Sequence, residues 1–217
     1  MSIILDERLK TVAEQFSLGA IGADIGADHG KLSAYLLINN ICSYMYVSDV
    51  SEVSVAKSKH LLEKHGLLDK STVLLSDGFD NIPKNIDTAA ICGLGGKSIA
   101  AIIKRLPRLN MLPKLILSPH TDLPIVRQTL MQINYKIIKE TVVWAKGRFY
   151  HIINAEQGLD TISKKEIYIG KNLNASSRDL LIKYYDWRFN VEKAKKQDDN
   201  PCLDWILEEL HTCLKQA

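Results

Sequence analysis

Two aspartates, a histidine and three glycines lie in one short segment, Ile21–Gly30, directly after the first apolar run of the chain. Gly26 and Gly30 can adopt backbone angles that other residues avoid, and they let a ligand approach the main chain. Asp24 and Asp28 can accept hydrogen bonds from ammonium or hydroxyl groups. The segment therefore predicts a cofactor-binding turn between a buried strand and a helix.

The spacing of the glycines indicates which charge the ligand carries. Dinucleotide-binding turns read Gly-x-Gly-x-x-Gly and hold two phosphates with bare backbone N–H groups. This chain instead has Gly22, Gly26 and Gly30, with an acid two residues before and two residues after Gly26. Carboxylates at these places favour the cationic amino-acid end of S-adenosyl-L-methionine over a pyrophosphate. Taken alone, the segment also fits an ordinary glycine-rich turn with solvated acids.

Acidic residues also follow the next two predicted strands. Asp49 comes after the strand 44–47, about twenty residues beyond the glycine turn, where an acid can accept from both ribose hydroxyls. Asp77 and Gly78 come after the strand 72–75, where Asp77 can accept from an adenine amine and Gly78 leaves room for a flat ring.

A fourth predicted strand, 88–92, leads into a run of glycines. The carboxyl ends of parallel strands meet at one edge of a sheet, and ligands bind there. The predicted cofactor-binding residues are Asp24, Gly26, Asp28, His29, Asp49, Asp77, Gly78, Gly93, Leu94, Gly95 and Gly96.

Strands and helices alternate over the first two thirds of the chain, which predicts an α/β fold with a parallel sheet. An amphipathic stripe of Leu5, Leu9, Val12 and Phe16 predicts an opening helix. Further helices are predicted over 31–39, 53–65, 97–106 and 124–133, a fifth strand over 114–117, and an antiparallel hairpin over 135–154 that turns at Lys146-Gly147.

The alternation stops after about residue 159. Two apolar stripes at helical spacing follow, one over 180–191 and one over 203–213, and Asn200-Pro201 is a favourable helix start. We predict a catalytic domain over 1–159 and a C-terminal α-helical hairpin, a coiled-coil-like domain, over 160–217.

Composition excludes several classes of protein. The chain has 217 residues, 46% of them hydrophobic, which suffices for a buried core. It has no apolar run near the roughly 20 residues that cross a bilayer and no cationic signal-peptide start, so we expect a cytoplasmic protein without membrane contact. The four cysteines lack the spacing of a zinc site, so we expect buried thiols and no bound metal.

The net charge of +3 is unevenly distributed along the chain. Residues 1–96 carry −4, residues 97–148 carry +8, residues 149–159 carry −1 and residues 160–217 carry 0. If the central bases share one face they would attract a polyanion such as RNA, while solvated helix surfaces are the competing interpretation. These bases are Lys97, Lys104, Arg105, Arg108, Lys114, Arg127, Lys136, Lys139, Lys146 and Arg148.

Together these motifs resemble the bacterial TrmK family of tRNA adenine-N1 methyltransferases. The resemblance is carried by residues 24–29, 76–78, 93–96 and 147–153 and by the coiled-coil-like tail. It implies a class I (Rossmann-like) S-adenosylmethionine-dependent methyltransferase fold, tRNA as the partner, and methylation at adenine 22 in the D-arm region. The chain departs from the family pattern at 30–33, Asp49, Leu94 and 118–120.

The predicted catalytic residues are Asp28, His29 and His120. N1 of neutral adenine carries an in-plane lone pair, so the reaction needs mainly alignment and desolvation. Asp28 is placed to stabilise the positive charge that the base acquires, while His29 and His120 are candidates for positioning the base or taking up a proton. Trp144, Phe149 and Tyr150 are candidates for stacking on bases, although strand aromatics more often pack in a core.

Two other classes of protein remain open from the sequence. A non-catalytic RNA-binding or cofactor-sensing homologue fits the departures on the substrate side. An NAD-dependent oxidoreductase fits less well, because the Gly-x-Gly-x-x-Gly loop is missing. The oligomeric state stays undetermined at this level.

Overall fold

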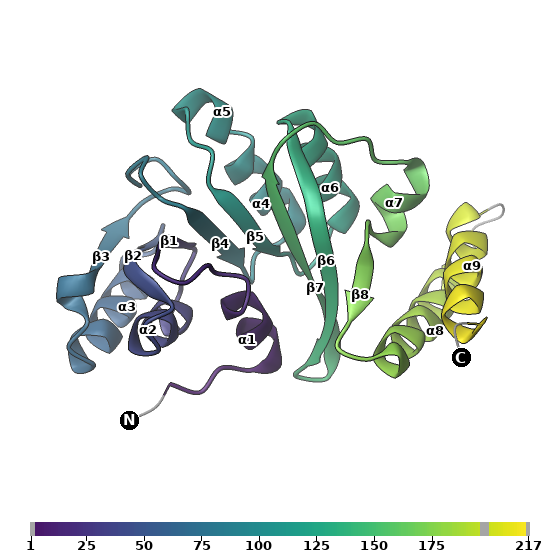
Figure 1. The fold of residues 1–217 in the computed structure, drawn as a ribbon, viewed down its shortest axis with the longest axis horizontal. Helices are drawn as coiled ribbons and strands as arrows, with labels where there is room; N and C mark the ends of the chain where they lie inside the picture. The colour runs from purple at the N-terminus through teal and green to yellow at the C-terminus, as the bar shows by residue number, and fades with distance from the viewer. Residues whose placement is uncertain (1–2, 196–199, 216–217) are drawn as a thin grey trace.

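One mixed sheet organises the part of the chain that the computed structural model describes, residues 3–195 and 200–215 (Figure 1). The strand order is β3-β2-β1-β4-β5-β7-β6-β8, and β1 to β5 run parallel to one another. The strands are β1 (Ala20–Ile25), β2 (Cys42–Asp49), β3 (Ser71–Leu75), β4 (Thr88–Cys92), β5 (Lys114–Ser118), β6 (Tyr135–Ala145), β7 (Arg148–Gln157) and β8 (Leu173–Ala175).

The chain changes direction across the sheet at β1. From β1 it proceeds outward to β2 and β3 on one side, then returns to place β4 and β5 on the other. This arrangement leaves a crevice at the carboxyl ends of β1 and β4, the place where open α/β sheets bind ligands. The predicted α/β fold class is confirmed.

Helices cover both faces of the sheet (Figure 1). Val12, Leu36 and Leu62 belong to one buried cluster, which α1, α2 and α3 form with the sheet. Ile99 and Val126 belong to the second cluster, from α4 and α6. The helices are α1 (Glu7–Ala13), α2 (Lys31–Ile38), α3 (Glu52–Lys64), α4 (Gly96–Ile103), α5 (Leu106–Leu109), α6 (Leu123–Gln132), α7 (Lys164–Ile169), α8 (Arg178–Ala194) and α9 (Pro201–Lys215), with a short 3-10 turn at Leu68–Lys70.

The predicted antiparallel hairpin is confirmed in β6 and β7. Its turn lies at Lys146 and Gly147, with φ of +48° and +78° respectively. The register shifts between Ile137 and Lys139, which is a β-bulge that increases the local twist. The hairpin joins the sheet through β7, which is antiparallel to β5.

The segment after residue 159 contains more than the predicted helical hairpin. A short helix, α7, begins with a capping box between Ser163 and Glu166. Strand β8 then pairs in parallel with β6, so the sheet extends beyond residue 159. A three-residue strand carries almost no periodic signal, which is why the sequence does not reveal it. The domain boundary at 159 stays a prediction.

Helices α8 and α9 pack together at the far end of the sheet (Figure 1). The Ser177 hydroxyl caps α8 by accepting from Leu180 N at 3.1 Å, and Asn200 Oδ1 accepts from Cys202 N at 3.1 Å at the start of α9. Tyr184 and Ile206 are buried in the cluster that these helices share with β6.

A buried polar chain ties α8 to the sheet. Arg127 is fully buried and forms an ion pair with Glu140, which also contacts His151 Nδ1 at 2.5 Å. Tyr184 OH lies 2.8 Å from His151 Nε2 and accepts from Arg188 Nη1 at 2.7 Å. Burial lowers the pKa of His151, so the neutral ring donates from Nδ1 to Glu140 and accepts from Tyr184. The expectation that Arg127 belongs to a basic surface is wrong, because it serves this internal chain.

Candidate functional site

The turn after β1 folds as its glycines predict. Gly26 has φ of +74° and donates its N–H to Ser48 O at 2.8 Å, which ties the turn to the end of β2. Gly30, with φ of +63°, begins α2, and a Cβ there would lie 3.1 Å from the Ser58 side chain. Asp28 also has a positive φ, of +51°, a conformation that Asp tolerates better than most residues.

Asp24 is the buried acid of this turn. Its side chain is 4% exposed and accepts a hydrogen bond from Ser33 Oγ at 2.9 Å. Burial raises the pKa of Asp24 to about 6, while the Ser33 bond opposes that rise. At neutral pH the carboxylate is therefore charged in a setting that favours a cationic partner.

Asp49 and Asp28 lie on the more open side of the turn. Asp49 accepts from Ser51 N at 2.9 Å and from Asp28 N at 3.1 Å, so both of its carboxylate oxygens are oriented. Asp28 is exposed, 3.3 Å from His29 Nε2 and 3.8 Å from Lys57 Nζ. Asp28 and His29 are thus close enough to act together on one group.

Two adjoining cavities occupy the carboxyl edge of the sheet, with volumes of about 470 and 420 Å³. Gly26, Asp49 and Leu94 line both of them. The larger cavity gathers eight of the predicted site residues, which are Asp24, Gly26, Asp28, His29, Asp49, Gly93, Leu94 and His120. The smaller cavity adds Asp77 and Gly78.

The smaller cavity is apolar on one side. Gly78 has φ of +59°, and a Cβ there would lie 3.0 Å from Ile102. Space for a flat ring therefore depends on this glycine. Asp77 accepts from Arg105 Nη1 at 2.9 Å, and Arg105 also pairs with Asp80, a contact that the sequence did not indicate.

The glycines after β4 divide into two roles. Gly93 has φ of +83°, which favours glycine, and a Cβ there would only reach ordinary contact with Arg8 and His120, which line the larger cavity. Gly95 and Gly96 do not line either cavity. Gly96 donates to Thr121 O at 3.0 Å, and a Cβ there would lie 2.4 Å from that oxygen. Its role in the structure is close packing of two loops.

His120 lies beyond β5 on the same edge. Its ring centroid is 5.6 Å from that of Tyr150. Burial and the nearby guanidinium groups of Arg148 and Arg8 lower the pKa of His120, so its imidazole is neutral at pH 7.

Arg8 is a site residue that sequence reasoning missed. It lines the larger cavity from α1, and its Nη1 is buried without a hydrogen-bond partner among the described residues. The guanidinium carbon lies 5.2 Å from the centroid of Tyr150, while Asp24 and Asp49 supply opposite charge in the same cavity. The available signal was a cation beside Leu9 on the apolar stripe of the opening helix.

These groups fit the cofactor that the sequence predicts. An α-amino acid end carries an ammonium and a carboxylate, which complement a buried aspartate and an unpartnered guanidinium. Asp49 offers oriented oxygens to hydroxyl groups, and the smaller cavity offers an apolar wall to a ring.

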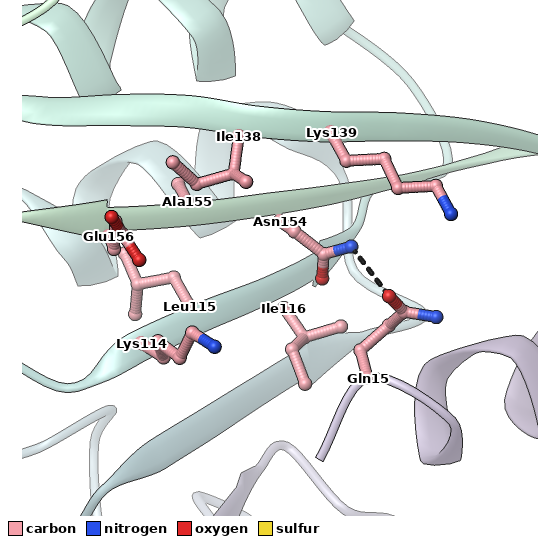
Figure 2. Close-up of a pocket in the computed structure, with 9 residues that line it drawn as sticks. All are labelled: Gln15, Lys114, Leu115, Ile116, Ile138, Lys139, Asn154, Ala155 and Glu156. Carbon is pink, nitrogen blue, oxygen red and sulfur yellow. Dashed lines mark hydrogen bonds between the residues drawn. The ribbon is translucent and has the colours of Figure 1, made fainter. Parts of the chain in front are cut away.

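A third cavity, of about 150 Å³, lies away from these two, near the start of β5 (Figure 2). Lys114 and Asn154 line it, and Asn154 Nδ2 donates to Gln15 Oε1 at 3.0 Å. It contains none of the predicted site residues and faces the amino end of β5, so we do not assign the candidate site to it.

The described residues contain no group of three or more His, Cys, Asp or Glu side chains that could hold a metal ion. Within the same part of the chain, no helix has the length and apolar character needed to cross a membrane.

Residues 5–153 match the family model of the methyltransferase domain. The chain is 32% identical over 173 residues to the tRNA (adenine(22)-N(1))-methyltransferase of Bacillus subtilis (strain 168), covering 79% of this chain and 71% of that protein. The crystal structure of the B. subtilis M1A22 tRNA methyltransferase TrmK superposes with a TM-score of 0.77 at 25% identity, covering 99% of each chain. M. capricolum TrmK in complex with S-adenosyl-homocysteine superposes with a TM-score of 0.76 at 25% identity, covering 98% of this chain and 97% of that one.

Proposed function

We propose a function from the premise that this chain belongs to the tRNA (adenine(22)-N(1))-methyltransferase family: it is an enzyme that methylates N1 of an adenine in tRNA with S-adenosyl-L-methionine. The target is adenine 22, the position that the family name states. Because its substrate is tRNA, we place the enzyme in the cytoplasm.

The observation that supports this most directly is the pairing of opposite charges in the larger cavity. We assign Asp24 to the ammonium of the cofactor and Arg8 to its carboxylate. Asp49 takes the ribose hydroxyls, and Asp77 with Gly78 takes the adenine in the smaller cavity. Each assignment follows from the hydrogen-bonding capacity of the side chain and from the cavity that it lines.

When bound, S-adenosyl-L-methionine would supply an electrophilic methyl group on its sulfonium. Transfer of this methyl to N1 of adenine would form the N–C bond as the C–S bond breaks, leaving S-adenosyl-homocysteine and moving the positive charge from sulfur to the base. The protein orients the two reactants and excludes water. Asp28, exposed at the mouth of the cavity, stabilises the cationic base, and His29 orients Asp28 from 3.3 Å. His120 is neutral, so it can donate one hydrogen bond to the incoming base or accept one from it.

The test is methylation of an unmodified tRNA transcript with labelled S-adenosyl-L-methionine. A methyl group on N1 blocks the Watson–Crick edge, so primer extension should stop at adenine 22, and mass spectrometry should identify 1-methyladenosine. A transcript with guanine at position 22 is the control. Absence of label, or label on the exocyclic amine, would contradict the proposal.

A further inference from the structure

An array of aromatic rings lies where the end of the β6–β7 hairpin meets α8. The ring centroid of Phe149 lies 4.6 Å from that of Trp144, 5.2 Å from that of Trp187 and 5.5 Å from that of Tyr184. Tyr184 is buried and supports the array from below. The outer rings belong to residues about forty positions apart, so only the folded chain brings them together.

The outer rings of this array are open to solvent. Trp144 is 48% exposed and Trp187 is 46% exposed, although each has aromatic neighbours that could have enclosed it. Beside Trp187 a groove of about 150 Å³ runs between β7 and α8, with Phe149 and Val191 among its lining residues. Trp187 lines this groove, and Trp144 adjoins it through Phe149. Half-exposed tryptophans of this kind are typical of a binding surface rather than of a core.

The groove adjoins the cofactor cavity at His120. His120 lines both of them, and the groove includes Tyr150, whose ring also receives Arg8 and Arg148 at 5.2 and 4.7 Å. A nucleic acid strand that places one base in the cofactor cavity near His120 can therefore bring the adjacent base toward Trp187.

The charges along the groove favour a polyanion over a peptide acid or a neutral ligand. The exposed Arg148 adjoins it through Tyr150, and Arg188 adds positive charge from the lining while its guanidinium donates to Tyr184. The acid in the lining, Glu192, is paired with Lys195 at 2.7 Å. Arginines beside exposed aromatic faces form the usual surface for single-stranded nucleotides, in which bases stack and phosphates contact cations.

We infer that this groove binds a base of the tRNA that neighbours the methylated adenine, by stacking it on Trp187 and Phe149. The inference rests on the proposed function. A displaced adenine must leave its helical stack, and a platform for its neighbour would hold the strand open beside the cofactor cavity.

The first test compares steady-state methylation by Trp187→Ala, Trp187→Phe and Trp205→Ala. Stacking on one aromatic ring contributes about tenfold or more to affinity, so Trp187→Ala should raise the KM for tRNA about tenfold, and Trp187→Phe should restore most of the loss. Trp205 lies on α9, half-buried and outside the groove, and is the matched control. Calorimetry with S-adenosyl-homocysteine should give an unchanged Kd for all three variants.

The second test uses binding alone and needs no turnover. A variant with Trp144→Phe and Trp205→Phe keeps Trp187 as its single tryptophan, since the chain has three. Its fluorescence should be quenched when unmodified tRNA is added, whereas a Trp144→Phe, Trp187→Phe variant that keeps Trp205 should change little.

The two proposals fail separately. If the wild-type protein methylates no tRNA, the proposed function is wrong, and quenching still reports on the groove. The wild-type protein could be active while Trp187→Ala and Trp205→Ala have the same KM for tRNA; the groove then has no role in tRNA binding. The same conclusion follows if added tRNA does not quench the fluorescence of Trp187. A Trp187→Ala protein with a lower melting temperature is judged by Trp187→Phe and by the fluorescence test.

Discussion

Asp24 and Arg8 give the cofactor cavity its two opposite charges at the residue scale. The carboxylate of Asp24 is buried yet charged at neutral pH, and Arg8 has a buried nitrogen without a partner among the described residues. Buried groups of this kind lower stability unless a ligand satisfies them. Both residues therefore lead to predictions about cofactor binding, and Asp24 also leads to one in which binding and folding respond in opposite directions.

Binding of S-adenosyl-homocysteine should weaken as the pH falls through about 6, because protonated Asp24 no longer attracts the ammonium group. Ser33→Ala removes a side-chain hydrogen bond that lowers the pKa of Asp24. The variant should therefore lose affinity for S-adenosyl-homocysteine at a higher pH than the wild-type protein. Calorimetric titrations between pH 5 and 8 give both midpoints. Identical midpoints in the two proteins would exclude Asp24 as the titrating group.

Asp24→Asn should stabilise the free protein while abolishing most cofactor affinity. The pKa of Asp24 is raised in the folded state, so its ionisation destabilises the fold increasingly from about pH 4 to about pH 6 and by a constant amount above. We expect the free energy of unfolding at pH 8 to rise by about 3 kcal/mol, with little gain at pH 4. Urea unfolding at the two pH values tests this, and a loss of stability at pH 8 would contradict it.

Arg8→Met should lower the affinity for S-adenosyl-homocysteine about tenfold or more, since a charge-assisted hydrogen bond to the carboxylate is lost. Lys10→Met is the control, because Lys10 lies on the same helix but is exposed and paired with Glu7. Calorimetry at pH 8 distinguishes the two variants. Equal affinities would assign Arg8 a packing role against Tyr150.

At the element scale, the chain from Arg127 through Glu140, His151 and Tyr184 to Arg188 fastens α8 to the sheet. A buried ion pair adds little to the free energy of unfolding compared with well-packed apolar side chains of the same volume. Removing one partner, however, leaves an uncompensated buried charge, which is strongly destabilising. The position of Trp187, one residue from Arg188, therefore depends on this chain.

Glu140→Gln should lower the free energy of unfolding at pH 7 by about 3 kcal/mol, because it leaves the buried Arg127 charge without its partner. Its neighbours hold the pKa of Glu140 at about 2, so this stabilisation is present above about pH 4.5 and is lost as the pH falls toward 2. Lys136→Met, which breaks the surface pair with Glu156, should cost at most about 1 kcal/mol. Chemical denaturation compares the two variants. Equal losses in the free energy of unfolding would show that the buried chain contributes no more to stability than a surface ion pair.

At the scale of the whole molecule, the C-terminal segment belongs structurally to the sheet. Strand β8 pairs with β6, and Tyr184 completes the hydrogen bonding of His151. Residues of α8 and α9 also cover Val142 of β6. The segment that would contact tRNA therefore also stabilises the domain that binds the cofactor.

A chain that ends at residue 159 should consequently melt at a lower temperature than the full chain, by several degrees or more, because it exposes Val142 and leaves His151 without Tyr184. Thermal unfolding followed by circular dichroism measures the difference. An unchanged melting temperature would show that residues 1–159 fold independently and would support the predicted domain boundary at 159.

The sequence by itself determined the parallel sheet, the hairpin over 135–154 and the acids at the strand ends, because each is encoded by neighbouring residues through periodicity and turn chemistry. Membership of the family followed from the same local motifs. The sequence did not predict the short strand β8, because three residues are too few to show an alternation of apolar and polar side chains.

Only the tertiary structure decided which charged side chains are buried in the interior of the protein. Arg127 and Arg148 are alike in sequence terms, yet one is buried against Glu140 and the other lies over Tyr150. It likewise decided that Arg8 enters the cofactor cavity and that Trp187 meets Phe149. The physical reason is that burial and pairing depend on residues far apart in the chain, which packing alone brings into contact.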